Sequence, residues 1–348
     1  MFEELHNSDG FRALQQVSSR LGNDPLQVQG PGGNSSIKRD GAMWIKASGT
    51  WLAEAETRDI MVPCDAGVLQ RALAEGAVDQ PGASTFVPAG MNPHGLRPSI
   101  ETAVHAALDW PVVLHTHCVA TIALAIRSDG AERIAALLPD LSPVIAPYVK
   151  PGWDLARTIR TSVVPETQVV VLGNHGLVVC GETAEAAEAL LRSVSARLTP
   201  DNLLPALAPH ADLTARLAGT DWVAAPDDIT HAVARDPARL AKAEGATLYP
   251  DHLIFLGPGC ISVASEAGLP ALGDLAPARK IMLLLGLGAA VPADASPAVL
   301  AMARCLGDVL ARVPEDAVLQ RLTAMEEADL LDWDAEKYRQ SLNKQTGA

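Results

Sequence analysis

Two histidines in the segment VVLHTH, residues 112–117, have the spacing of a metal-binding pair. On a β-strand, side chains at positions i and i+2 point to the same face, so His115 and His117 would project together from the end of an apolar run. Because histidine is the commonest metal ligand, this arrangement indicates half of a metal site. The alternative for so short a motif is two polar residues at the exposed end of a strand.

A third histidine stands in VVVLGNHG, residues 169–176, where a β-branched run ends at two glycines that bracket His175. Glycines at such a place permit positive φ angles and close approach of the backbone, which suits a loop that presents a ligand at the rim of a sheet. Alone, this motif is weak evidence for a metal ligand, and it becomes stronger evidence in combination with His115 and His117.

A carboxylate is available in PSIETAVH, residues 98–105. Ser99 has the side chain of a helix N-cap, Glu101 then falls in the first helical turn, and His105 follows one turn later on the same face. A glutamate in a first turn often only complements the helix dipole. His105 is expected to support the site from behind or to lie on the helix surface.

Three imidazoles and one carboxylate together predict a site for zinc or a similar divalent ion. His115, His117 and His175 would be the ligands, and a fourth position would be open to water, to substrate or to a displaceable Glu101. The remaining histidines have no comparable neighbours, and we interpret them as structural or surface residues: His6, His94, His210, His231 and His252.

A glycine-rich segment, GPGGNSS at residues 30–36, precedes the motif KASGT. An Asp-Gly pair between the two predicts a hairpin turn, which would bring them side by side. Backbone N–H groups, Asn34, Ser48 and either Lys38 or Lys46 could then converge on an anion such as a phosphate. The alternative is a plain glycine-rich loop.

Periodicity and turn residues predict an α/β chain in this region. Residues 11–21 have apolar side chains at helical spacing before Gly22, and RDGA at residues 39–42 separates the two segments of a β-hairpin. Beyond the hairpin, apolar runs alternate with alanine-rich helical stretches, which indicates a buried sheet flanked by helices. The strand candidates are residues 111–114, 144–146 and 169–172, and the helix candidates are residues 100–108, 119–126 and 184–198.

A proline-rich segment after residue 198 has no settled period and predicts a domain boundary between residues 199 and 220. The first domain would comprise residues 1–205. Residues 220–348 would form a smaller, mostly helical α/β module that caps the site or builds the oligomer. The strand candidates of this module are residues 253–256 and 261–264, and its helix candidates are residues 297–312 and 315–331.

A GxG motif in LGLGAAV, residues 285–291, follows an apolar run. It lacks the third small residue of a dinucleotide-binding loop, and no acidic residue stands about 20 positions further on in a recognisable βαβ unit. We therefore interpret the motif as a turn, and a dehydrogenase is a disfavoured reading of the whole chain.

Composition and charge exclude several classes of protein. The chain has 348 residues, 48% of them apolar and 20% charged, which is typical of globular proteins and long enough for two domains. A net charge of −14 opposes polyanions, so nucleic-acid binding is not expected. The longest apolar run is too short to span a membrane, the N-terminus has no secretory signal, and the five cysteines form no CxxC pair. We expect a cytoplasmic protein with free thiols.

The motifs GGNSSIK, IKASGT, PSIE followed by His105, HTH and GNHG resemble, in order and spacing, those of the class II aldolase/adducin family. The resemblance covers about residues 5–200. It is closest to the aldolase part of bifunctional rhamnulose-phosphate aldolase/dehydrogenase proteins, through PYVKPGWDLA at residues 147–156. It implies a three-layer α/β/α sandwich around a mainly antiparallel central sheet, whereas the alternation of elements alone suggests a parallel one.

The resemblance also implies roles for individual residues. His115, His117 and His175 match the zinc ligands of the family, and Glu101 matches its catalytic carboxylate, which can also close the metal shell when substrate is absent. One position departs from the family, since Ile100 stands where many of its aldolases have a second phosphate-binding serine. The expected phosphate-binding residues are Asn34, Ser48, Gly49 and Ser99, together with Lys46.

The expected function is metal-dependent cleavage of a ketose 1-phosphate to dihydroxyacetone phosphate and an aldehyde, a lyase reaction of carbohydrate metabolism. The metal, zinc or else Mn²⁺ or Co²⁺, would stabilise the enediolate as a Lewis acid. The alternatives are an epimerase, decarboxylase or dehydratase on the same site, or a non-catalytic adducin-like scaffold, which would not need the metal set. The expected partner is a small phosphorylated sugar, with no nucleic acid and no membrane, and the resemblance implies a homo-oligomer, a tetramer.

Overall fold

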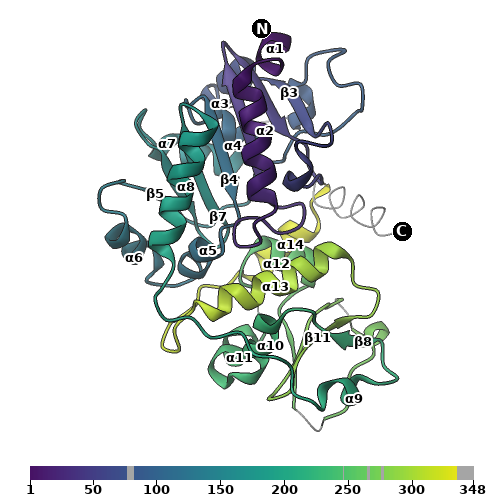
Figure 1. The fold of residues 1–348 in the computed structure, drawn as a ribbon. Coiled ribbons are helices and arrows are strands. Elements are labelled where there is room, and N and C mark those ends of the chain that lie inside the picture. The colour runs from purple at the N-terminus through teal and green to yellow at the C-terminus, as the bar shows by residue number, and fades with distance from the viewer. Residues whose placement is uncertain (77–81, 246, 265–266, 276–277, 335–348) are drawn as a thin grey trace. The chain divides into compact units, whose positions relative to one another are not determined.

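The chain of this computed structural model forms two compact units (Figure 1): Met1–Cys118 with Ile134–Arg197, and Val119–Arg133 with Leu198–Ala348. All residues predicted for the site belong to the first unit. The last part of the predicted C-terminal module, residues 335–348, lies outside the described residues. The structure describes residues 1–76, 82–245, 247–264, 267–275 and 278–334.

The first unit is built around a seven-stranded sheet in the order β3-β2-β1-β4-β7-β6-β5. Neighbouring strands are antiparallel except β5 and β6, which are parallel. The sheet is therefore mixed and mainly antiparallel, as the family resemblance predicts. The strands are β1 (Asn34–Arg39), β2 (Ala42–Lys46), β3 (Met61–Asp65), β4 (Val112–Thr116), β5 (Val144–Ala146), β6 (Val169–Leu172) and β7 (Gly176–Gly181).

Helices cover both faces of this sheet (Figure 1). Helices α2 and α8 lie on one face, and α3, α4 and α7 lie on the other. The predicted three-layer α/β/α sandwich is confirmed. The helices that lie wholly or partly in this unit are α1 (Phe2–His6), α2 (Asp9–Gly22), α3 (Ala66–Ala74), α4 (Thr102–Ala106), α6 (Gly130–Leu137), α7 (Trp153–Ser162) and α8 (Ala184–Leu198).

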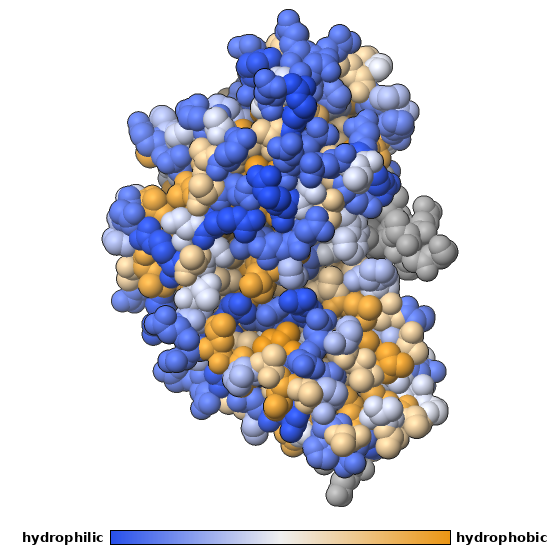
Figure 2. All heavy atoms as spheres, in the orientation of Figure 1, coloured by the Kyte–Doolittle hydropathy of each residue, from blue (hydrophilic) through white to orange (hydrophobic). Residues whose placement is uncertain are grey.

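Helix α2 confirms the helix predicted for residues 11–21. It begins after Ser8, whose Oγ accepts a hydrogen bond from the N–H of Phe11 at 3.1 Å. Its buried side chains recur at helical spacing and include Leu14 and Val17. The opposite side of the helix is polar, and Figure 2 shows a mostly hydrophilic surface there.

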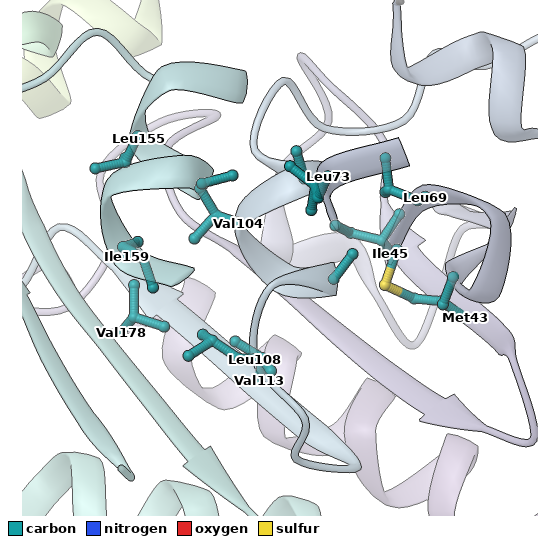
Figure 3. Packing of buried hydrophobic residues seen from close by; sticks show 14 of the residues in the cluster. Met43, Ile45, Leu69, Leu73, Val104, Leu108, Val113, Leu155, Ile159 and Val178 are labelled. Atoms are coloured by element: carbon teal, nitrogen blue, oxygen red, sulfur yellow. The ribbon is translucent and has the colours of Figure 1, made fainter. Parts of the chain in front are cut away.

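The second face of the sheet holds a large apolar core (Figure 3). Ile45, Val113 and Val178 project from β2, β4 and β7 onto this face. Val104 of α4 and Ile159 of α7 pack against them, and each of these side chains is at most 1% exposed. Full burial of a side chain of this size contributes about 1.5–3 kcal/mol, so this core fixes α4 against the sheet.

The predicted hairpin of β1 and β2 is confirmed, with Arg39 opposite Ala42. The two turn residues, Asp40 and Gly41, have φ angles of 52° and 82°. Positive φ at both positions defines the type I′ turn, whose twist matches that of the flanking strands. The turn therefore sets the register of β1 against β2.

The second unit contains a four-stranded sheet in the order β8-β11-β10-β9. With its helices it is a mostly helical α/β module, as predicted. No helix within the described ranges is both long enough and apolar enough to cross a membrane. The strands are β8 (Trp222–Ala224), β9 (Ile261–Val263), β10 (Met282–Leu284) and β11 (Gly288–Pro292), and the helices are α5 (Val119–Ala125), α9 (Leu213–Leu217), α10 (Asp228–Arg235), α11 (Pro237–Ala243), α12 (Pro250–Leu256), α13 (Pro297–Ala311) and α14 (Ala324–Leu331).

One prediction for this unit is wrong, and a second is wrong about where a helix begins. Residues 253–256, predicted as a strand, belong to α12. Pro250 occupies the first turn of that helix, where proline is favoured, and a short apolar run does not distinguish a buried helix from a strand. The helix predicted for residues 315–331 begins only after Thr323, because Thr323 and Glu326 form a capping box there.

Other predictions for this unit are confirmed. The strand expected at residues 261–264 is β9, and the helix expected at residues 297–312 is α13. The GxG motif joins β10 to β11, and Gly286 has a φ of 75° in that turn. The apolar run around it is therefore two short strands of one sheet.

We expect Gly41→Ala to destabilise the first unit by about 1 kcal/mol, because a side chain is strained at the positive φ of this position. No atom of the described residues lies within 4 Å of the added methyl group, so the expected cost is backbone strain. The free energy of unfolding in urea measures the effect. Gly82→Ala is the matched control, since Gly82 has equally open space and an ordinary φ of −58°. Equal losses in both variants would contradict this account of the turn.

Candidate active site

The three predicted histidine ligands meet at the ends of adjacent strands. His115 lies in β4, His117 follows the end of that strand, and His175 lies in the turn between β6 and β7. Because β4 pairs with β7, the turn comes to the end of β4. All three side chains are buried, with ring centroids 5.1, 4.9 and 5.1 Å apart. One nitrogen of each ring lies within 4.8 Å of the others.

Two glycines allow the backbone to come close enough to form this cluster. A Cβ at Gly32 would lie 2.8 Å from Nδ1 of His117, and a Cβ at Gly176 would lie 2.4 Å from the carbonyl oxygen of Thr116. A side chain at either position would force the site apart. Asn174 has a φ of 52°, a conformation that asparagine tolerates better than most residues, and it tightens the β6–β7 turn.

The carboxylate of Glu101 contacts the imidazole cluster. Its Oε2 is 3.3 Å from Nε2 of His115, and its Oε1 is 3.7 Å from Nε2 of His175. Burial alone raises the pKa of this carboxyl group. Electrostatic interactions with His115, His175 and His117, with a hydrogen bond from Asn34, outweigh burial and lower the pKa to about 2. Glu101 is therefore ionised at neutral pH.

The start of helix α4 differs from the prediction. Glu101 is the N-cap residue and the helix begins at Thr102, so Glu101 is not in the first turn. The physical reason is a β-bridge between Ala47 and Pro98, which keeps the chain extended up to Ser99. Ser99 still caps this segment, since its Oγ accepts a hydrogen bond from the N–H of Glu101 at 3.2 Å.

The donor set fits a divalent metal ion. Nδ1 of His115 donates to the carbonyl oxygen of Leu177 at 3.1 Å, which leaves Nε2, the nitrogen that faces Glu101, to bind a metal. A backbone carbonyl behind the ring is a usual companion of a metal-ligating histidine. Oε1 of Glu101 accepts no hydrogen bond from the described part of the chain. The buried cluster of His115, His117 and His175 could therefore bind a metal.

Asn34, predicted as a phosphate ligand, lies opposite His115 in the pairing of β1 with β4. Its Nδ2 donates to Oγ of Ser99 at 3.0 Å and to Oε2 of Glu101 at 2.8 Å. Its Oδ1 is hydrogen-bonded to Nε2 of His105. Both amide protons are thus committed within the protein, and the side chain holds Glu101 in place. Its role in binding phosphate stays a prediction.

The other predicted phosphate residues lie around the bridge between Ala47 and Pro98. The hydroxyl of Ser48 and the N–H of Gly49 make no hydrogen bond among the residues that the structure describes. The hydroxyl of Ser99 accepts two hydrogen bonds and keeps its own proton for a ligand. The structure brings these donors to one short segment, and their binding of a phosphate stays a prediction.

The two lysines considered for the anion site are both bonded to backbone carbonyls. Nζ of Lys46, which is 2% exposed, donates to two carbonyl oxygens of the glycine-rich segment at 2.9 and 3.0 Å. Nζ of Lys38 donates to the carbonyl oxygens of His105 and Leu108 at the C-terminal end of α4. Burial lowers the pKa of Lys38 to about 8. Lys38 therefore sits at the opposite end of α4 from Glu101.

Comparison with known proteins adds one decisive finding. The family model described as "Class II Aldolase and Adducin N-terminal domain" matches residues 12–197, more than half of the chain. The chain belongs to this family. The class II aldolase/adducin domain thus coincides with the part of the chain that contributes every residue of the cluster described above.

Individual relatives of this class II aldolase/adducin protein are more distant. The chain is 29% identical over 187 residues to "Uncharacterized oxidoreductase YuxG" of Bacillus subtilis (strain 168), a match that covers 51% of this chain and only 27% of that protein. It is also similar to the N-terminal class II aldolase domain of a conserved protein from Thermoplasma acidophilum, with 26% identity, a TM-score of 0.47 and coverage of 55% of this chain and 92% of that one. It is similar as well to L-fuculose-1-phosphate aldolase from Thermus thermophilus, with 18% identity and a TM-score of 0.38. That match covers 54% of this chain and 90% of the other.

Sequence reasoning did not resolve the position of His105, and the structure does. The side chain is fully buried behind Glu101, and its Nδ1 is 2.7 Å from Oγ of Ser36. One signal could have indicated this position. Asn34, Ser36 and Lys38 alternate along β1, so they share one face of the strand, and all three contact residues on or before α4.

We expect about one divalent ion per chain, and we expect His117→Ala to lose it, because the variant removes one of the three imidazoles that could bind a metal. Elemental analysis of protein purified without added metal, and after incubation with Zn²⁺, Mn²⁺ or Co²⁺, measures the metal content. His210→Ala is the control, since His210 is 45% exposed and belongs to the second unit, and it should keep the full content. Wild-type protein that binds none of these ions would contradict the site.

Proposed function

We propose that this chain is a zinc-dependent class II aldolase that cleaves a ketose 1-phosphate into dihydroxyacetone phosphate and an aldehyde. The observation that carries the proposal is the buried carboxylate of Glu101 against the imidazoles of His115 and His175, at 3.3 and 3.7 Å. Membership of the class II aldolase/adducin family supports metal-dependent chemistry at this cluster. Zinc is proposed because catalytic zinc is usually bound by three protein ligands, such as three imidazole nitrogens, and keeps a fourth coordination position open. Mn²⁺ and Co²⁺ are the alternatives.

The proposed reaction breaks the bond between C3 and C4 of the ketose. The C4 hydroxyl loses its proton and becomes the aldehyde carbonyl, while C3 gains a proton in the ketone product. When bound, a divalent ion would supply Lewis-acid stabilisation of the charge that develops on the substrate oxygens. Glu101 is the group proposed to move the proton at C3, removing it in the condensation direction and returning it in cleavage.

The phosphate is proposed to bind at the hydroxyls of Ser48 and Ser99 and the N–H of Gly49. These donors are available for a ligand, and Gly49 has a φ of 79°, which lets the backbone turn toward an anion. Lys46 contributes by holding the carbonyls of the glycine-rich segment in place. Because the phosphate is remote from the bond that breaks, its binding energy would position the substrate.

The other reactions considered on this site, epimerisation, decarboxylation and dehydration, would use the same residues. A non-catalytic scaffold is disfavoured, because burying a carboxylate with three imidazoles destabilises the fold, and a scaffold would gain no function from this cluster. The second domain, proposed as residues 220–348 beside a first domain of 1–205, is assigned to capping the site or to assembly. The homo-oligomer and the cytoplasmic location stay predictions.

A panel of ketose 1-phosphates and keto-acid phosphates, incubated with metal-loaded enzyme, tests the proposal. We expect release of dihydroxyacetone phosphate, and we expect Glu101→Gln to lower turnover by about 10²–10⁴-fold, the usual contribution of a positioned acid or base. The amide keeps an oxygen for the hydrogen bond from Asn34, so fold and metal content should persist. Glu185→Gln, at an exposed position of α8, is the charge-matched control.

The outcomes of this assay separate the candidate reactions. An epimer, carbon dioxide or a dehydrated ketose as the product would replace the aldolase by the corresponding enzyme on the same site. Turnover by Glu101→Gln equal to that of wild type would remove Glu101 from the mechanism.

We expect Ser48→Ala to raise the KM for a phosphorylated substrate about 10–100-fold, since the variant removes one hydrogen bond to a charged group, worth about 1.5–3 kcal/mol. The metal content should not change, because the hydroxyl is chemically separate from the imidazoles. Comparison of the phosphorylated sugar with its unphosphorylated analogue measures the selectivity. Ser162→Ala, at an exposed position of α7, is the control. An equal loss for both sugars would place the phosphate elsewhere.

A further inference from the structure

One face of β1 holds helix α4 through three polar side chains. Asn34, Ser36 and Lys38 alternate along the strand, and each is hydrogen-bonded to Glu101 or to residues of α4 and its end. Between Asn34 and Ser36 lies the ring of His105, which is 0% exposed. A fully buried ring with both nitrogens engaged is placed in one orientation, so its proton has a defined position.

The hydrogen-bond partners determine where that proton is. Nδ2 of Asn34 donates to Oγ of Ser99 at 3.0 Å and to Oε2 of Glu101 at 2.8 Å, so this end of the amide is the NH₂ group. The amide oxygen of Asn34 therefore faces Nε2 of His105, and because an amide oxygen cannot donate, Nε2 must carry the proton. Nδ1 then accepts from the hydroxyl of Ser36 at 2.7 Å.

The surroundings of His105 agree with a neutral ring that has this single proton. Burial, and then the charges of Lys38 and His115, lower the pKa of His105 to about 3 against the opposing effect of Glu101. The chain of donors runs from Ser36 through His105 and Asn34 to Glu101. Each pair of heavy atoms along it lies within hydrogen-bond distance, so the geometry alone supports every link.

We propose that His105 is a positioning residue that fixes the orientation of the Asn34 amide and, through it, the carboxylate of Glu101. Without the Nε2 proton, the oxygen of the Asn34 amide loses the donor that holds it, and the amide is held through its nitrogen end. A flipped amide would point its oxygen at Oε2 of Glu101, and the two acceptors would repel each other. The consequence for turnover rests on the proposed function, and the orientation of the amide does not.

Two substitutions of similar size separate this role from simple packing. A glutamine at position 105 can place its amide nitrogen near the former Nε2 and donate to Asn34, whereas an asparagine reaches only as far as the former Nδ1 and keeps the partner Ser36. Loss of an outer-shell partner commonly lowers activity about 10–100-fold. We expect His105→Asn to lower kcat by that amount with little change in KM, and His105→Gln to stay within about 3-fold of wild type.

Melting temperature and metal content are measured on the same two variants. We expect equal metal content and similar melting temperatures for both, with the difference confined to kcat. Equal kcat for the two variants, or losses that follow the melting temperature, would show a packing role and overturn the proposal.

A spectroscopic readout tests the same hydrogen bonds without any turnover. In the wild-type protein labelled with ¹⁵N-histidine, we expect the signal of His105, identified as the one missing from His105→Gln, to be that of a neutral ring with protonated Nε2 and unprotonated Nδ1, unchanged between pH 5 and 8. His231, whose Nε2 donates to the carbonyl oxygen of Ala225 and whose Nδ1 accepts from the N–H of Ala289, should give a signal of the same kind that stays in the variant. A His105 ring protonated at Nδ1, or at both nitrogens, would overturn the proposal even if the enzyme is an aldolase. If His105 has the expected protonation but the protein cleaves no sugar phosphate, the result would contradict the proposed function and leave the role of His105 in orienting Asn34 intact.

Discussion

A carboxylate buried against three imidazoles is the constraint on which the rest of the first unit depends. An ionised carboxylate out of water costs several kcal/mol unless hydrogen bonds and positive charge compensate it. Glu101 receives this compensation from the amide of Asn34 at 2.8 Å and from the ring nitrogens at 3.3 and 3.7 Å. The close approach at Gly32, the tight turn at Gly176 and the bridge that ends at Ser99 keep these groups within reach.

Strand register is what brings the compensating groups together. Asn34 lies opposite His115 because β1 and β4 are antiparallel in one register, and a slip of one residue would turn Asn34 to the other face of the sheet. On its other side, the register of β1 is fixed by the hairpin to β2, whose Asp40-Gly41 turn admits only two residues. The turn therefore sets β1 against β2, and the separate pairing with β4 places Asn34 opposite His115.

Local sequence patterns predict the features whose causes are local. The HTH and GNHG motifs at strand ends, the Asp-Gly turn and the amphipathic first helix are of this kind, and the family resemblance adds the antiparallel sheet. Contacts between distant residues are not readable in this way: Asn34 reaches Glu101 across 67 positions and His105 across 71. The late start of α4 likewise depends on a bridge to Ala47. The strand predicted at residues 253–256 fails because its apolar pattern fits a buried helix equally well.

Lys38 and Lys46 are kept away from the carboxylate by backbone carbonyls. Nζ of Lys38 bonds to the C-terminal end of α4, whereas Glu101 stands at its N-terminal end, and Nζ of Lys46 bonds to the glycine-rich segment. An ammonium group beside Glu101 would neutralise the carboxylate and compete with a metal ion for it. With Lys38 and Lys46 held in this way, the donors proposed for the phosphate are the neutral groups of Ser48, Gly49 and Ser99. In a chain with a net charge of −14, such donors can select a phosphate by geometry, while interactions with His115, His175 and His117 lower the pKa of Glu101.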